Sequence, residues 1–212
     1  MGDLYNALMQ FRKNQKGSAW GKISIPDTID LMKPWKTLGT DILLDTPFCK
    51  FKIEKCELPD GRVMPKYYVM EFTDWVNILP ITTDGKVILI KQYRQGSMEC
   101  TWEIPGGAVH PDEGNESLDA ARRELEEETG FSSNEVLRLG SMSPNPALQR
   151  NQLHTYVALN CKKIGEQNLD PFEEIEVHLF DKAEVLKMIK RGEITHSLIV
   201  ASLFLALDHL TS

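Results

Sequence analysis

The sequence has few cysteines, and no two of them form a CxxC pair. Its four cysteines, Cys49, Cys56, Cys100 and Cys161, are scattered over 212 residues. Structural zinc sites usually take ligands from closely spaced cysteine pairs, so this spacing argues against such a site. Isolated thiols are typical of a reducing compartment, where disulfides are rare. We therefore expect a cytoplasmic protein with unpaired cysteines.

Long apolar segments are also missing. The longest apolar run extends from Leu198 to Leu207 and is interrupted by Ser202, whereas a membrane-spanning helix needs about 20 apolar residues. The N-terminus, from Met1 to Tyr5, contains no apolar stretch of the kind that a secretory signal requires. The sequence therefore predicts neither a membrane partner nor export.

Basic residues are in the minority. The chain has 24 lysines and arginines against 31 aspartates and glutamates, which gives a net charge of −7. A protein that follows the phosphate backbone of DNA or RNA needs clustered cations, so this balance argues against broad nucleic-acid binding and predicts no DNA partner. A phosphorylated small molecule needs only a few local cations and stays compatible with the composition.

The length and the apolar content suit one globular domain with a small appended part. Hydrophobic residues make up 42% of the chain, so a core of ordinary size can form without a metal or a disulfide. Residues 1–36 are weakly patterned and are expected to form an N-terminal extension. Residues 37–75 are expected to form an N-terminal β lobe, and residues 76–212 the main domain.

Runs of β-type residues between turn signals predict strands in the first half of the chain. The turn signals are Pro59-Asp60-Gly61 and Asp84-Gly85. The predicted strands are 48–54, 67–72, 76–81, 86–94 and 102–104. The first two are expected to pair as a hairpin across the Pro59 turn.

The second half of the chain mixes helices with strands. A helix is predicted from about Asn115 to Thr129, because Leu118, Ala121 and Leu125 form an apolar stripe and Gly130 is a suitable stop. Two strands and two further helices are predicted at 136–142, 153–159, 183–190 and from Thr195 onward.

Three glutamates share one face of the 115–129 helix. Glu124, Glu127 and Glu128 are spaced i, i+3 and i+4, and like charges at this spacing repel by a few tenths of a kcal/mol per pair. An acidic helix face is usually just solvated surface. The other reason for the pattern is a hard divalent cation such as Mg²⁺, which prefers carboxylate oxygens. The helix alone leaves both interpretations open.

The turn before this helix favours the cation. A strand end at Ile104-Pro105 leads into Gly106-Gly107, where the missing Cβ atoms let the backbone approach an ion or a phosphate closely. A carbonyl of this turn can complete a metal shell. Arg123, one turn before Glu127, can orient that carboxylate through a charge-assisted hydrogen bond.

Residues 107–131 resemble the Nudix box, a glycine-started loop and helix that ends in the pattern Arg-Glu-aliphatic-x-Glu-Glu-x-Gly-aliphatic. The matching residues are Arg123, Glu124, Leu125, Glu127, Glu128, Gly130 and Phe131. One box glutamate is absent from its usual place seven residues before Arg123, where this chain has Asn115. The loop from Gly107 is also two residues longer, which leaves Glu113 or Glu116 to substitute for that peripheral ligand.

Over roughly residues 36–210 the chain is similar to the ADP-ribose pyrophosphatase branch of that family. The similar segments are Leu58–Gly61, Lys91–Arg94, Trp102–Gly107, Pro146 at sixteen residues beyond Gly130, and Gly192–Ile194. The resemblance implies an α+β Nudix fold, an α/β/α sandwich with a mixed sheet, preceded by a small β-hairpin lobe. It also implies a homodimer that exchanges this lobe.

The resemblance implies Mg²⁺-dependent hydrolysis of ADP-ribose or a related nucleoside diphosphate sugar to a nucleoside monophosphate and a sugar phosphate. It implies two or three Mg²⁺ ions, for which Mn²⁺ can substitute, held by Glu124, Glu127, Glu128 and the carbonyl of Gly106. The residues expected to bind substrate are Arg94, Glu103, Phe48 and Pro146.

The general base is expected on the helix. Some members of the branch use a glutamate in the loop after the proline, but residues 147–152 contain no acid. The role is therefore given to Glu127. His154 is expected to be structural. Glu173 and Glu174 could close over the site, but a solvated position is the favoured interpretation for both.

Two other functions stay open beside this one. The chain is compatible with a Nudix enzyme for dinucleotide polyphosphates or RNA 5′ ends, although the net charge of −7 leans away from RNA. A non-catalytic nucleotide-sugar sensor is the other alternative. Such sensors tend to lose the box acids, and the three central ones are present here.

Overall fold

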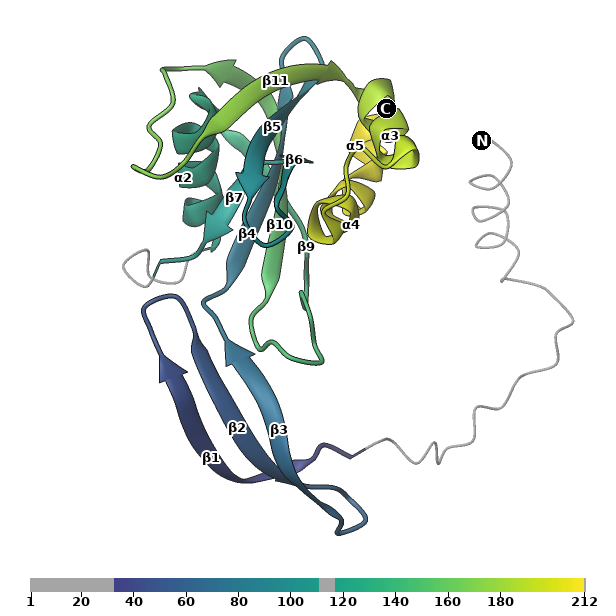
Figure 1. The fold of residues 1–212 in the computed structure, drawn as a ribbon. Helices are drawn as coiled ribbons and strands as arrows, with labels where there is room; N and C mark the ends of the chain where they lie inside the picture. The colour runs from purple at the N-terminus through teal and green to yellow at the C-terminus, as the bar shows by residue number, and fades with distance from the viewer. Residues whose placement is uncertain (1–32, 111–116, 212) are drawn as a thin grey trace, which may run out of the picture.

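The computed structural model describes residues 33–110 and 117–211 (Figure 1). Most of the expected N-terminal extension lies outside these residues, as do Glu113, Asn115 and Glu116. The described chain forms a small N-terminal sheet and a larger sheet with helices on both faces (Figure 1).

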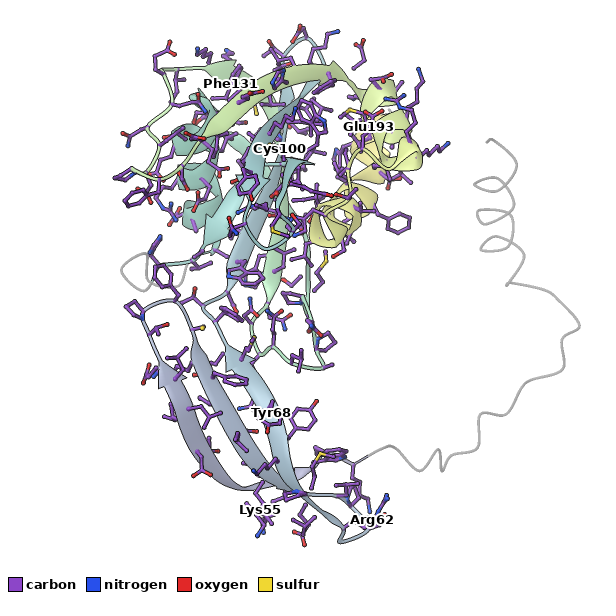
Figure 2. All side chains as sticks on the ribbon, viewed as in Figure 1. Lys55, Arg62, Tyr68, Cys100, Phe131 and Glu193 are labelled. Atoms are coloured by element: carbon purple, nitrogen blue, oxygen red, sulfur yellow. The ribbon has the colours of Figure 1, made fainter. Side chains whose placement is uncertain are left out.

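The N-terminal lobe is a three-stranded antiparallel sheet in the order β1-β2-β3. Its strands are β1 (Lys36–Asp45), β2 (Lys50–Glu57) and β3 (Val63–Glu71). The predicted hairpin is confirmed as β2 and β3, whose turn closes through Gly61 N–H donating to the carbonyl of Leu58 at 2.9 Å. Lys55 and Arg62 lie at the end of the lobe that is farthest from the larger sheet (Figure 2).

The larger sheet is mixed, with the order β11-β5-β4-β10-β8. Its long strands are β4 (Trp75–Thr82), β5 (Lys86–Arg94), β10 (Leu153–Lys163) and β11 (Ile175–Asp181). Four further strands complete it: β6 (Glu99–Glu103) on β5, β7 (Gly106–Ala108) on β4, and β8 (Phe131–Ser132) and β9 (Glu135–Met142) on β10. The β4–β10 pair is parallel and the other pairs are antiparallel.

Helices cover both faces of the larger sheet (Figure 1). Helix α2 (Ser117–Thr129) packs on one face, and α3 (Lys182–Arg191), α4 (Ser197–Leu205) and α5 (Leu207–Thr211) pack on the other. Strand β5 contributes to the hydrophobic cores on both faces of the sheet. Ile88 packs in the core beneath α2, and Leu89 packs in the core beneath α4. Its continuous apolar run reflects this double burial. The predicted α/β/α sandwich with a mixed sheet is thereby confirmed.

The loop between β9 and β10 ties the N-terminal lobe to the main domain. The N–H of Met70 in β3 donates to the carbonyl of Leu148 at 2.7 Å, and the Arg150 guanidinium donates to the buried carboxylate of Glu54 at 2.6 Å. Pro146 lies in this junction, where it lines a cavity of about 290 Å³. The orientation of the lobe therefore depends on this loop.

The described helices are short. In the part of the chain that the structure covers, no helix has both the length and the apolar character that crossing a lipid bilayer requires.

Candidate active site

A pocket of about 790 Å³ opens where the end of β5, the start of β4 and the start of α4 meet. One side of the pocket is apolar and includes Trp75 and Leu153. The other side is polar and includes Arg94, Glu103 and His196. The glycine turn predicted from the sequence, Gly106–Ala108, also lines the pocket, and it pairs with β4 as the short strand β7.

The two glycines of this turn allow unusually close packing. A Cβ atom on Gly106 would lie 2.2 Å from the carbonyl oxygen of Val76. A Cβ atom on Gly107 would lie 2.2 Å from Oε1 of Glu124. Any larger residue would therefore displace the neighbouring strand or an acid of α2. Gly107 is therefore required for Glu124 to reach the turn, and Gly106 is required for the turn to pack against β4.

Helix α2 directs Glu124 and Glu128 toward this turn, and both side chains are buried. The backbone N–H of Gly106 donates to Oε2 of Glu128 at 2.9 Å. Burial raises the pKa of Glu128 well above its usual value, and the nearby charge of Glu124 raises it further. Burial also raises the pKa of Glu124, although Arg123 opposes that effect. The two acids therefore form a repelling pair in a poorly solvated position.

Glu127 has a different environment from these two acids. Nη1 of Arg123 donates to Oε2 of Glu127 and to Oε1 of Glu124, both at 2.9 Å. Nη2 of the same arginine donates to the carbonyl of Ala108 at 3.1 Å. The predicted contact between Arg123 and Glu127 is present, and the Glu127 side chain stays partly exposed.

The acid pair fits a hard divalent cation. Among residues 33–110 and 117–211, no three His, Cys, Asp or Glu side chains gather as a metal cluster, so the described donors are Glu124, Glu128 and the backbone of Gly106. Within the same ranges, no lysine or arginine forms an ion pair with Glu128. Two buried carboxylates with raised pKa values are stabilised by added positive charge, and their oxygens suit Mg²⁺.

Arg94 and Glu103 form a bidentate ion pair on the polar wall. Nε and Nη2 of Arg94 donate to the two carboxylate oxygens of Glu103 at 2.8 Å and 2.7 Å. Burial alone would raise the pKa of Glu103, but hydrogen bonds from Arg94 and from its other neighbours lower it to about 2. Glu103 is thus ionised and holds Arg94 in place. The Arg94 side chain remains partly exposed and lines the pocket.

Not every residue expected to bind substrate lines this pocket. Arg94 and Glu103 do, as does Gly106, which was expected to be a metal ligand. Phe48 lies in the turn between β1 and β2 with 85% of its surface exposed, and Pro146 lies in the cavity against the N-terminal lobe. In a single chain, the structure does not bring these last two residues to the acid pair.

His196 was missed by the interpretation of the sequence, whereas Glu173 was named there as a residue that could close over the site. Glu173 is exposed, as expected, and its negative charge adds to the effects that raise the pKa of both Glu124 and Glu128. His196 reaches Glu103 from the first residue before α4, with Nδ1 and Oε2 separated by 3.4 Å. The only sequence signal near His196 is the familiar Gly192–Ile194 segment.

His154 agrees with its expected structural role. Its ring bonds to Ser141 at 2.7 Å and to Asp74 at 3.0 Å, and it is not among the residues that line the pocket.

Comparisons with known proteins give consistent results. The model of the NUDIX domain family matches residues 72–203. The ADP-ribose pyrophosphatase of Bacillus subtilis is 28% identical over 160 residues, covering 75% of this chain and 85% of its own length. The methanol dehydrogenase activator of Bacillus methanolicus is 29% identical over 163 residues, covering 76% of this chain and 86% of its own length.

The fold is shared with a solved structure. The crystal structure of an ADP compounds hydrolase superposes with a TM-score of 0.73 and 23% identity, covering 85% of this chain and 96% of the other. The family match spans more than half of the chain and includes the glycine turn, helix α2 and the start of α4. The predicted resemblance is therefore confirmed, and the chain belongs to the Nudix domain family.

Proposed function

We propose that this protein hydrolyses ADP-ribose or a related nucleoside diphosphate sugar to a nucleoside monophosphate and a sugar phosphate. The observation that carries the proposal is the buried pair of Glu124 and Glu128 behind Gly106–Gly107, next to a pocket that also contains Arg94. The relatives named ADP-ribose pyrophosphatase and the structural neighbour named ADP compounds hydrolase support the same substrate class.

The residues of the site have separate proposed roles in binding a diphosphate substrate. Glu124, Glu128 and the carbonyl of Gly106 would hold the cation, with Glu127 as a further ligand. Two or three Mg²⁺ ions, or Mn²⁺ in their place, would neutralise phosphate charge and activate water. Arg94, held in place by Glu103, is positioned to contact a phosphate. Trp75, whose ring lies 5.4 Å from that of Phe72, offers a flat apolar surface for the base.

Two glutamates compete for the role of general base. Glu127 is held by Arg123, whereas the exposed Glu173 carboxylate accepts a hydrogen bond from the N–H of Asp170 at 3.1 Å, and its charge acts on both buried acids. We assign the role to Glu173, because a base needs a carboxylate that is free to accept a proton from water.

Glu173→Gln is expected to lower kcat by about 10²-fold, the usual contribution of a positioned base. Glu127→Gln is expected to lower it less, because its carboxylate orients Arg123 and assists metal binding. The measurement is kcat for both variants at saturating Mg²⁺. A larger loss in Glu127→Gln would return the base role to Glu127.

A substrate panel tests the proposed function. ADP-ribose, other nucleoside diphosphate sugars, dinucleotide polyphosphates, a nucleoside triphosphate and a 5′-triphosphorylated RNA would be incubated with the protein and Mg²⁺. We expect the highest kcat/KM for a nucleoside diphosphate sugar, with a nucleoside monophosphate as product. Preference for the RNA or for dinucleotide polyphosphates would overturn the substrate assignment, and binding without turnover would indicate a sensor.

We also propose that the protein forms a homodimer through the N-terminal lobe. All ten residues of β1 are exposed, including Ile42, Leu43 and Leu44, and Phe48 protrudes from the adjoining turn. Exposed apolar groups on an edge strand favour pairing with another chain. A second copy would cover this surface and bring Phe48 toward the partner's pocket.

Ile42→Asp is therefore expected to convert a dimer to a monomer in analytical ultracentrifugation. Leu179→Asp is the matched control, because Leu179 is similarly exposed (53% against 56% for Ile42) but lies on β11 of the main sheet. A monomeric wild-type protein at assay concentration, or equal effects of both variants, would contradict the proposed interface.

The proposed location is the cytoplasm. All four cysteines lie within the described residues and are free, although Cys100 is exposed. Exposed free thiols persist most readily in a reducing compartment.

A further inference from the structure

Helix α4 begins with a residue that does not cap it. His196 occupies the N-cap position, yet its side chain makes no capping hydrogen bond. Ser, Thr, Asp and Asn are the usual residues here because their side chains accept from the first free N–H groups. The His196 side chain turns instead toward the pocket wall formed by β6, which carries Glu103.

The ring of His196 has one buried edge and one edge available to the pocket. Its Nδ1 is buried, lies 3.4 Å from Oε2 of Glu103 and has no hydrogen-bond partner of standard geometry. The side chain as a whole is 35% exposed and belongs to the pocket lining. Nε2 is not among the described side-chain atoms that are both buried and without a hydrogen-bond partner, so it belongs to the open edge of the ring.

Glu103 determines which nitrogen of the neutral ring carries the proton. Its carboxylate is paired with Arg94 and is therefore ionised, so it favours an N–H at the nearby Nδ1. The neutral ring then presents Nε2 as a hydrogen-bond acceptor. An acceptor at this position suits a hydroxyl group better than a phosphate, which has only acceptor oxygens to offer.

The surroundings of His196 also suit hydroxyl groups. Thr195 and Ser197 flank it, and Glu99 and Thr101 line the same side of the pocket. Trp75 and Leu153 lie on the apolar side, beyond the glycine turn. In the sheet, Trp75 pairs with Ala108 and Asn77 with Gly106, so the turn separates the apolar end from Glu103 and its neighbours. A diphosphate at this turn would direct its two substituents to opposite ends.

We propose that His196 contacts the distal sugar of the substrate, with Nε2 accepting a hydrogen bond from a sugar hydroxyl while Glu103 holds the opposite edge of the ring. This inference rests on the proposed hydrolysis of nucleoside diphosphate sugars and assigns the polar end of the pocket to the half without the base. His196 is then a specificity residue for the sugar.

Two substrates that differ only in the distal sugar test this role. ADP-ribose carries the sugar, and the methyl ester of ADP keeps the nucleoside and the diphosphate but replaces the sugar with a methyl group. The variant is His196→Asn, since asparagine is a good N-cap residue but too short to replace the ring. His178→Gln is the control, because His178 lies on β11 beside Trp102 and outside the pocket.

His196→Asn is expected to lower kcat/KM for ADP-ribose about tenfold, mainly through a higher KM, as loss of one good hydrogen bond would do. Its kcat/KM for the methyl ester is expected to stay within about twofold of wild type. His178→Gln should leave both substrates unchanged. Thermal unfolding of each variant checks that the fold persists.

The outcomes separate this inference from the proposed function. If His196→Asn lowers kcat/KM equally for both substrates, His196 supports the site in general and the sugar contact is wrong, while the hydrolase function stands. If the change lies in kcat alone, the contact is likewise overturned. If wild-type protein cleaves neither compound, the proposed function fails and the sugar assignment fails with it.

Discussion

Glu128→Gln is expected to lower kcat by about 10³-fold or more while leaving the protein folded. The amide keeps the size of the side chain and can still accept the hydrogen bond from the N–H of Gly106. It removes the negative charge that would bind the cation beside Glu124. The measurement is kcat at saturating ADP-ribose over a range of Mg²⁺ concentrations, together with the unfolding temperature.

Glu126→Gln is the matched control for this variant. Glu126 lies on the same helix but faces solvent, where it accepts a hydrogen bond from Ser132. Its replacement should leave kcat within about twofold of wild type, as surface substitutions usually do. Near-normal turnover in Glu128→Gln would remove this residue from the metal site.

Glu128→Gln is also expected to change how stability depends on pH. The pKa of Glu128 is raised in the folded protein, so its carboxylate opposes folding once the pH exceeds the ordinary value of 4.5. In the absence of divalent metal, wild type should therefore lose stability relative to Glu128→Gln as the pH rises above about 5. Mg²⁺ should abolish this difference. Parallel unfolding curves in EDTA from pH 5 to pH 8 would contradict the assigned burial effect.

Arg94→Gln is expected to reduce both stability and activity. It leaves the buried carboxylate of Glu103 without its bidentate partner. Breaking a buried pair typically costs about 3–5 kcal/mol, and the partial exposure of Arg94 reduces the expected loss to about 2 kcal/mol. Activity should fall about 10²-fold, because a positioned phosphate contact is also lost. Chemical denaturation and steady-state kinetics measure the two effects.

A double-mutant cycle of Arg94→Gln and Glu103→Gln measures the interaction free energy between these two side chains. Removing both charges should be less destabilising than the sum of the single changes, with a coupling of about 1–3 kcal/mol. Because hydrogen bonds lower the pKa of Glu103 to about 2, the stabilisation is present above pH 4.5 and is lost as the pH falls from 4.5 toward 2. Additive effects, or the same acid sensitivity in Glu103→Gln, would refute the pairing as a source of stability.

Strands that are buried or half-buried were the easiest to predict. The prediction of 86–94 coincides with β5, because both of its faces are covered and its residues form one apolar run. Strand β1 was missed, since all of its residues are exposed and no alternation of burial marks it. Strand β11 was also missed, although Ile175, Val177 and Leu179 alternate in its sequence.

The sequence by itself determined where the proposed metal ligands lie. Residues three and four apart on a helix share a face, so the placement of Glu124 and Glu128 follows from local geometry. The role of the adjoining glycines can also be predicted from the sequence. Only a residue without Cβ fits there, because an added Cβ would lie 2.2 Å from a neighbouring atom. These features depend on residues that are close in the chain, so they can be predicted without knowing the fold.

The tertiary structure decided the rest of the site. Pairing of β5 with β6 brings Arg94 to Glu103, and packing of α4 brings His196 to the same carboxylate. The same packing leaves Phe48 and Pro146 outside the pocket of a single chain. Contacts between distant segments arise from how layers bury their apolar faces, and no local spacing in the sequence encodes them.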